Sequence, residues 1–83
     1  MGEVVAVMRI MPEDPEKFEI MKEKVASAVK AEKIEEEPIA FGLKALKVTV
    51  VVKDEEGGTE AVEKKLAEIP EVSDVKVIDL GRL

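Results

Sequence analysis

Two hydrophobic periodicities alternate along this chain of 83 residues, and their order constrains the fold more than any other feature. Apolar residues at every second position are typical of strands, whereas apolar residues three and four positions apart are typical of amphipathic helices. The clearest strand signal is KALKVTVVVK, in which Leu46, Val48 and Val50 share one face and Lys47 and Thr49 share the other. The expected strands are Glu3–Met11, Lys33–Phe41, Lys44–Lys53 and Val72–Leu80, with one helix from residue 15 to about residue 30 and a second between Thr59 and Pro70.

Local signals mark the boundaries of these segments. Asp14 is expected to cap the first helix, with Pro15 at its first position, where the missing N–H costs nothing. Thr59 is the expected cap of the second helix, and Pro70 is expected to end it. Pro38 falls inside the second strand, and because proline cannot donate to a sheet ladder, that strand is expected at an edge.

The order strand–helix–strand–strand–helix–strand predicts an α+β fold in one domain, residues 1–83. Right-handed crossovers then give a ferredoxin-like βαββαβ sandwich, a four-stranded antiparallel sheet with two helices on one face. The first and third strands are the most apolar and are expected at the centre of the sheet. The predicted core contains Met21, Val25, Leu46, Val48, Val50, Val62 and Leu66.

The composition excludes several kinds of chemistry. Without Cys or His, the chain has no thiol nucleophile, no disulfide framework and no zinc ribbon. A net charge of −6 argues against nucleic-acid binding, and the central strands carry no aromatic residue to stack bases. The longest apolar run, residues 48–52, is far short of the roughly 20 residues of a membrane span, and no signal-peptide pattern opens the sequence. We expect a cytoplasmic monomer that binds neither membranes nor nucleic acid.

Two acidic runs, Glu35–Glu37 and Asp54–Glu56, offer carboxylates of the kind that hard cations prefer. We interpret them as solvated edge and loop segments and expect no metal site. Gly57 and Gly58 precede Thr59, and together they could hold an anion on the amides of a helix N-terminus. A turn with a capping threonine explains the same residues, and no P-loop lysine follows. We therefore expect no cofactor and no catalytic residue.

One of the two aromatic residues, Phe41, stands directly before Gly42, between an acidic run and the third strand. An edge strand that contains a proline three residues earlier is a poor place to bury a phenyl ring. A turn that presents the ring at low side-chain entropy would instead make an anchor for a pocket on another protein. From the residues alone, core filler and exposed anchor both remain open.

Three segments, MGEVVAVMRIMPEDP, EEEPIAFGLKALKVTVVVKDEEGGTEAVE and VSDVKVIDLGRL, closely resemble the archaeal-type translation elongation factor 1-beta family. Members of that family are guanine nucleotide exchange factors for the GTPase elongation factor 1-alpha and make no covalent bond. The chain also resembles the eukaryotic exchange domain, which has a Gly-aromatic-Gly-Ile/Leu-Lys segment and ends in a basic residue followed by Leu. The resemblance implies partner-binding roles for Phe41, Gly42, Lys44, Arg82 and Leu83.

In this family the aromatic residue packs on the GTPase domain and the basic residue reaches toward the magnesium and phosphate site. The resemblance therefore implies that Phe41 is an anchor and Arg82 a displacing cation. Two positions depart from the eukaryotic pattern: Ala40 replaces a glycine, and Arg82 replaces a lysine with a broader, forked donor. Arg82 is expected to follow the last strand, on a terminus that is free to reach outward.

A ferredoxin-like regulatory domain that binds small molecules, such as amino acids, at a dimer interface is the alternative function. It predicts self-association and stabilisation by a small molecule, neither of which the exchange function predicts. A small hydrolase of this shape would need a catalytic Asn, and the chain has none.

Overall fold

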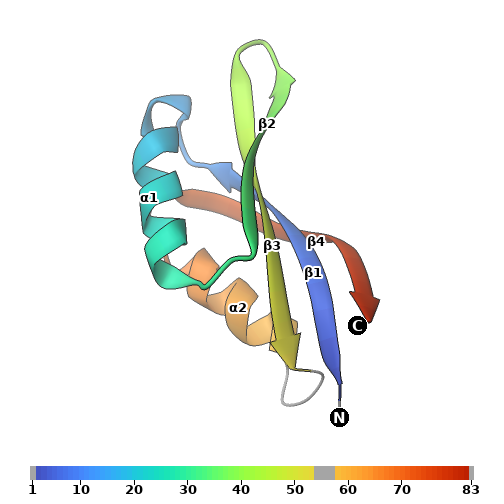
Figure 1. Cartoon of the computed structure of the whole chain (residues 1–83). Helices are drawn as coiled ribbons and strands as arrows, with labels where there is room; N and C mark the ends of the chain where they lie inside the picture. Colours follow the sequence, from blue (N-terminus) through green and yellow to red (C-terminus); the bar gives the residue numbers. More distant parts are fainter. Residues whose placement is uncertain (1, 54–57, 83) are drawn as a thin grey trace.

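The computed structural model describes residues 2–53 and 58–82. All four expected strands and both expected helices are present, in the expected order (Figure 1). None of the helices in the described part of the chain is long and apolar enough to cross a membrane. The elements are β1 (Glu3–Pro12), a short 3-10 helix η1 (Pro15–Lys17), α1 (Phe18–Ala28), β2 (Lys33–Ala40), β3 (Leu43–Lys53), α2 (Gly58–Ala67) and β4 (Val72–Arg82).

The four strands form one antiparallel sheet in the order β2-β3-β1-β4. Both helices cover the same face of this sheet (Figure 1). The predicted ferredoxin-like α+β fold is confirmed, with β1 and β3 at the centre. Pro38 lies in β2, which is an edge strand as expected, and edge strands are where a sheet tolerates a residue without a backbone N–H.

The core lies between the sheet and the helices, and strand alternation selects the residues that enter it. Ala6, Met8 and Ile10 of β1 are fully buried, while the residues between them face the uncovered side of the sheet and are only partly buried. The predicted core residues Met21, Val25, Leu46, Val48, Val50 and Leu66 are all buried. Val62 is only partly buried and packs against this cluster from its margin.

Several predicted boundaries are wrong by a few residues. The region from residue 15 to about residue 30 is a 3-10 turn followed by an α-helix that already ends at Ala28. Thr59 lies inside α2, which begins at Gly58, so Thr59 is not its N-cap. α2 ends at Ala67, before Pro70. The cap at Asp14 is confirmed, because its Oδ1 accepts a hydrogen bond of 2.9 Å from the backbone N–H of Glu16.

Candidate functional site

The turn between β2 and β3 consists of Phe41 and Gly42, and both have a positive φ, 51° and 79° respectively. Left-handed values at both central residues define the type I′ turn, whose twist matches that of the flanking strands. Gly42 adopts this conformation without strain. Phe41 is the only non-glycine residue with a positive φ in the described chain, and a side chain in this region costs roughly 1–2 kcal/mol.

The ring of Phe41 is fully exposed, at 101% of its reference surface, whereas the other aromatic, Phe18, is 3% exposed and belongs to the core. The structure therefore excludes Phe41 as core filler. A bulky apolar side chain that is both exposed and held in a strained backbone conformation is typical of a functional position, because folding alone would favour Asn, Asp or Gly there.

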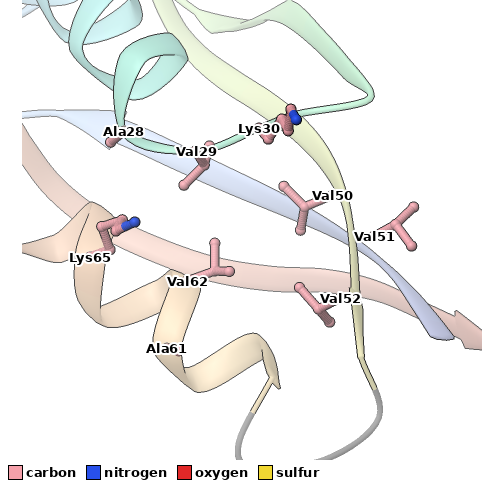
Figure 2. A pocket seen from close by; sticks show the side chains of 9 residues that line it. All are labelled: Ala28, Val29, Lys30, Val50, Val51, Val52, Ala61, Val62 and Lys65. Atoms are coloured by element: carbon pink, nitrogen blue, oxygen red, sulfur yellow. The ribbon is translucent and has the colours of Figure 1, made fainter. Parts of the chain in front are cut away.

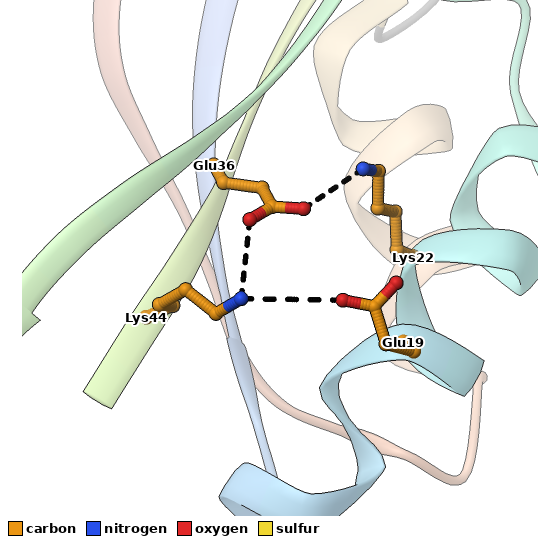
Figure 3. A network of polar contacts seen from close by, with 4 residues as sticks. All are labelled: Glu19, Lys22, Glu36 and Lys44. Carbon is orange, nitrogen blue, oxygen red and sulfur yellow. Dashed lines mark hydrogen bonds and ion pairs between the residues drawn. The ribbon is translucent and has the colours of Figure 1, made fainter. Parts of the chain in front are cut away.

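Lys44 belongs to a polar cluster between the sheet and α1, together with Glu19, Lys22 and Glu36 (Figure 3). Its Nζ lies 3.1 Å from Oε1 of Glu36, and the other oxygen of Glu36 accepts a hydrogen bond of 2.9 Å from Nζ of Lys22. Oε2 of Glu19 lies 4.0 Å from the Lys44 ammonium, which also sits 4.6 Å from the centre of the Phe18 ring. Lys44 is thus engaged within the molecule, on the side of the sheet that the helices cover.

Hydrogen bonds in this cluster shift the protonation equilibria of its members. The bond from Lys22, followed by the bond from Lys44, lowers the pKa of the Glu36 carboxyl, and the same bond to Glu36 raises the pKa of Lys22. A second pair joins α1 to the start of β4: Nζ of Lys24 lies 2.8 Å from the buried Oε1 of Glu71. The interaction with Lys24 lowers the pKa of the Glu71 carboxyl.

Acidification is therefore expected to weaken the fold through Glu36 and Glu71. A carboxyl whose pKa is lowered by folding stabilises the folded state above its ordinary pKa of 4.5. That contribution is lost as the pH falls through the lowered value. The melting temperature, measured from about pH 7 to about pH 3, should fall less in a Glu36→Gln/Glu71→Gln double variant than in the parent.

Glu23→Gln is the matched control for this measurement, because Glu23 is an exposed glutamate of α1 with no ion pair to any described residue. It should retain the acid sensitivity of the parent. A double variant that loses melting temperature as steeply as the parent would show that other groups cause the acid sensitivity.

Arg82 was expected to follow the last strand. It is instead part of that strand. β4 extends to Arg82, which pairs with Val4 of β1 and is exposed. The expectation of a terminus free to reach outward from Arg82 is thus wrong for the backbone of this residue, because its position is fixed by the ladder. Leu83 lies outside the described residues.

Phe41 and Arg82 lie at opposite ends of the molecule. The β2–β3 turn forms one end of an elongated body measuring 41 × 22 × 16 Å, and β4 finishes near the other end (Figure 1). The five residues that the resemblance implied are therefore not one compact site. Phe41 and Gly42 form the turn at one end, Lys44 belongs to a surface cluster of ion pairs beside that turn, and Arg82 lies at the far end.

The acidic run of β2 is divided between the two faces of the sheet. Glu36 meets Lys22 and Lys44 on the helix side, whereas Oε1 of Glu37 accepts a 3.1 Å hydrogen bond from Arg9. In the described residues no group of three or more acidic side chains could hold a metal ion. The run Asp54–Glu56 lies outside those residues, as does Gly57 of the predicted anion-binding turn.

A hollow of about 250 Å³ lies where α1 and α2 diverge above the end of β3 (Figure 2). Most of the described residues that line it are apolar, including Val50, Val52 and Val62, and the charged ones among them are Lys30 and Lys65. It explains why Val62 is only partly buried.

Sequence reasoning missed two features near the tip. Ile39 and Leu43, which flank Phe41 and Gly42, are exposed apolar residues. The signal that could have found them is the apolar composition of the hairpin end, IAFGL, where turns are normally polar. The pairing of Lys44 with Glu36 was also missed, because it depends on the register of β2 on β3.

Comparison with known proteins matches nearly the whole chain to one family. Residues 5–83 match the family model of the EF-1 guanine nucleotide exchange domain. The chain is 49% identical to elongation factor 1-beta of Methanosphaera stadtmanae and 50% identical to that of Methanothermobacter thermautotrophicus, in both cases over 100% of this chain and 99% of the relative. Elongation factor 1-beta of Methanobrevibacter smithii is 48% identical over the same shares. The chain therefore belongs to the EF-1 guanine nucleotide exchange domain family, alongside the archaeal elongation factors 1-beta.

Proposed function

We propose that this protein promotes the exchange of GDP for GTP on elongation factor 1-alpha and so regenerates the GTP form that binds aminoacyl-tRNA. The match of the exchange-domain model to residues 5–83 carries this proposal. The exposed ring of Phe41 supports it, since a strained and exposed aromatic residue suits an anchor for another protein.

The protein acts by binding alone, without covalent chemistry. An exchange factor binds its nucleotide-free partner more tightly than the GDP-bound partner, and linkage requires that it weakens GDP binding by the same factor. GTP then refills the vacated site and displaces the factor. The described residues contain neither Cys nor His nor a cluster of metal-binding carboxylates, and nothing in this scheme needs them.

Phe41 and Arg82 lie at opposite ends of the molecule, and the proposal gives them different tasks. Phe41 supplies affinity by seating its ring in a pocket of the GTPase. Arg82, at the other end of the molecule, acts near the magnesium and phosphate site, where a cation repels the metal and competes for its ligands. In this proposal the protein acts as a monomer and contacts its partner at two places.

The decisive experiment is the release of fluorescent GDP from purified elongation factor 1-alpha, followed by stopped flow with and without this protein. The proposal requires release to accelerate in proportion to the protein added until the partner is saturated. An unchanged release rate at saturating protein would refute it. Self-association together with a melting temperature raised by amino acids would favour the regulatory-domain alternative instead.

Arg82→Ala is expected to slow GDP release far more than it weakens binding, because the cation acts on the bound metal and phosphate. Arg82→Lys should retain most of the activity if charge alone matters and lose it if the forked guanidinium is needed. Both are measured by stopped flow over a range of magnesium concentrations, with Lys76→Ala, another exposed cation of β4, as the control. Parent-like release by Arg82→Ala at every magnesium concentration would remove Arg82 from the mechanism.

A further inference from the structure

The end of the β2–β3 hairpin carries an unusual concentration of exposed apolar surface. Ile39 is 45% exposed, Phe41 is 101% exposed and Leu43 is 38% exposed. These three side chains fall within five consecutive residues, whereas the other large apolar side chains that are exposed in the described chain lie on α1 and β4. We refer to Ile39, Phe41 and Leu43 as the apolar tip.

A β-bulge lies among the members of the apolar tip, where β2 meets the turn. Pro38 pairs with Lys44 and Ala40 pairs with Leu43, so β2 advances by two residues while β3 advances by one. In such a bulge two residues of one strand oppose a single residue of the other, which places Ile39 beside Ala40 and opposite Leu43. Phe41 follows immediately in the turn. The register up to Pro38 would itself pair Ile39 with Leu43, so these two side chains lie close together, and the bulge shortens the turn to Phe41 and Gly42.

Two charged residues that flank the apolar tip, Glu37 and Lys44, form ion pairs with other parts of the sheet. Glu37 pairs with Arg9 of β1, at 3.1 Å, and Lys44 pairs with Glu36 at 3.1 Å on the helix side of the sheet. The tip itself is therefore free of charged side chains, in a protein whose composition is 39% charged. The ion pair of Glu37 with Arg9 links the base of the hairpin to the central strand β1. The ion pair of Glu36 with Lys22 links it to α1.

We propose that Ile39 and Leu43 join Phe41 in one contact surface, which inserts as a unit into a neutral, apolar hollow on the GTPase partner. This inference rests on the proposed exchange function and names the chemistry of one of its two contacts. The strained φ of Phe41 supports it, since the hairpin forgoes the Asn-Gly or Asp-Gly turn that its geometry favours. An uncharged contact is insensitive to salt, in contrast to one made by Arg82.

The test compares Ile39→Thr, Leu43→Thr and the double variant with Ile20→Thr. Threonine keeps the strand preference of a β-branched side chain while removing apolar surface. Ile20, which is 48% exposed on α1, is the matched control outside the tip. The affinity of each variant for nucleotide-free elongation factor 1-alpha is measured by calorimetry at low and high salt, and the melting temperature of each variant is measured alone.

Each tip variant is expected to bind about fivefold to tenfold more weakly, by the same factor at both salt concentrations, with an unchanged melting temperature. Ile20→Thr should bind like the parent. If the double variant binds and exchanges as well as the parent, Phe41 acts alone and the shared contact surface is refuted. The exchange function would then still stand. Equal losses in Ile20→Thr, or losses that vanish at high salt, would also refute it.

Two further outcomes would show whether the exchange function itself, or only the role of the apolar tip, is wrong. A parent protein that neither binds the GTPase nor accelerates GDP release would overturn the exchange function and the tip with it. A parent that sediments as a dimer, and becomes monomeric in the double variant, would assign the apolar tip to contacts between copies of this chain and overturn the proposal.

Discussion

Leu66→Ala is expected to reduce the free energy of unfolding by about 2–5 kcal/mol. Leu66 is fully buried and is the one residue of α2 that enters the core completely. Truncation removes its apolar contacts and leaves a cavity that the surrounding strands can fill only in part. Because a domain of this size has a total stability of about 5–15 kcal/mol, the variant should unfold at a markedly lower denaturant concentration.

The measurement is denaturant unfolding of the parent, of Leu66→Ala and of Leu80→Ala. Leu80 is exposed on β4, so the same truncation there should change the free energy of unfolding by no more than about 0.5 kcal/mol. Equal effects of the two substitutions would mean that α2 does not pack on the sheet through Leu66, and that the register of this helix is wrong.

Phe41→Ala is expected to weaken binding to elongation factor 1-alpha by at least about 2 kcal/mol, or about 30-fold in the dissociation constant. The fold should remain intact, because the ring contributes nothing to the core. The informative partner variant is Phe41→Asn. Asparagine tolerates the left-handed region, so this variant should lose binding as severely while its stability rises by up to about 1 kcal/mol.

Calorimetry for binding and thermal unfolding for stability distinguish the two roles of Phe41. An anchor predicts opposite changes in Phe41→Asn, with weaker binding and a higher melting temperature. A structural residue predicts a melting temperature lowered by several degrees in both variants without any loss of binding. The latter result would return Phe41 to the core and would contradict its exposure in the structure.

The order of the elements, the sheet and most of the core could be predicted because they follow from local periodicity. Strand alternation in β3 places Leu46, Val48 and Val50 on one face wherever the strand lies in the sheet. Pro38 identifies an edge strand from its own chemistry, and Asp14 followed by Pro15 identifies a helix start. None of these inferences needs to know which residues meet across the fold.

The helix and strand limits depended on tertiary pairing. β4 continues through Gly81, a residue with low strand preference, because Val5 and Val4 of β1 pair with Gly81 and Arg82. Val62 has the helical spacing of a core residue, yet α1 and α2 diverge beside it and leave a hollow. The angle between two helices is set by how their side chains pack, and no periodicity within one helix encodes it.

The candidate site shows the same division. The sequence by itself determined that the chain turns at Gly42 beside an edge strand, placed Phe41 at the end of that strand, and left both burial and exposure of the ring open. Only the tertiary structure decided for exposure, because the register of β2 on β3 leaves two residues for the turn and forces both into left-handed conformations. The same register sets Ala40 opposite Leu43. Lys44 meets Glu36 of β2 and, through the packing of α1, Glu19 and the ring of Phe18. Strand register and helix packing are relations between segments that lie far apart in the sequence. They are therefore set by the whole fold and not by any one stretch of sequence.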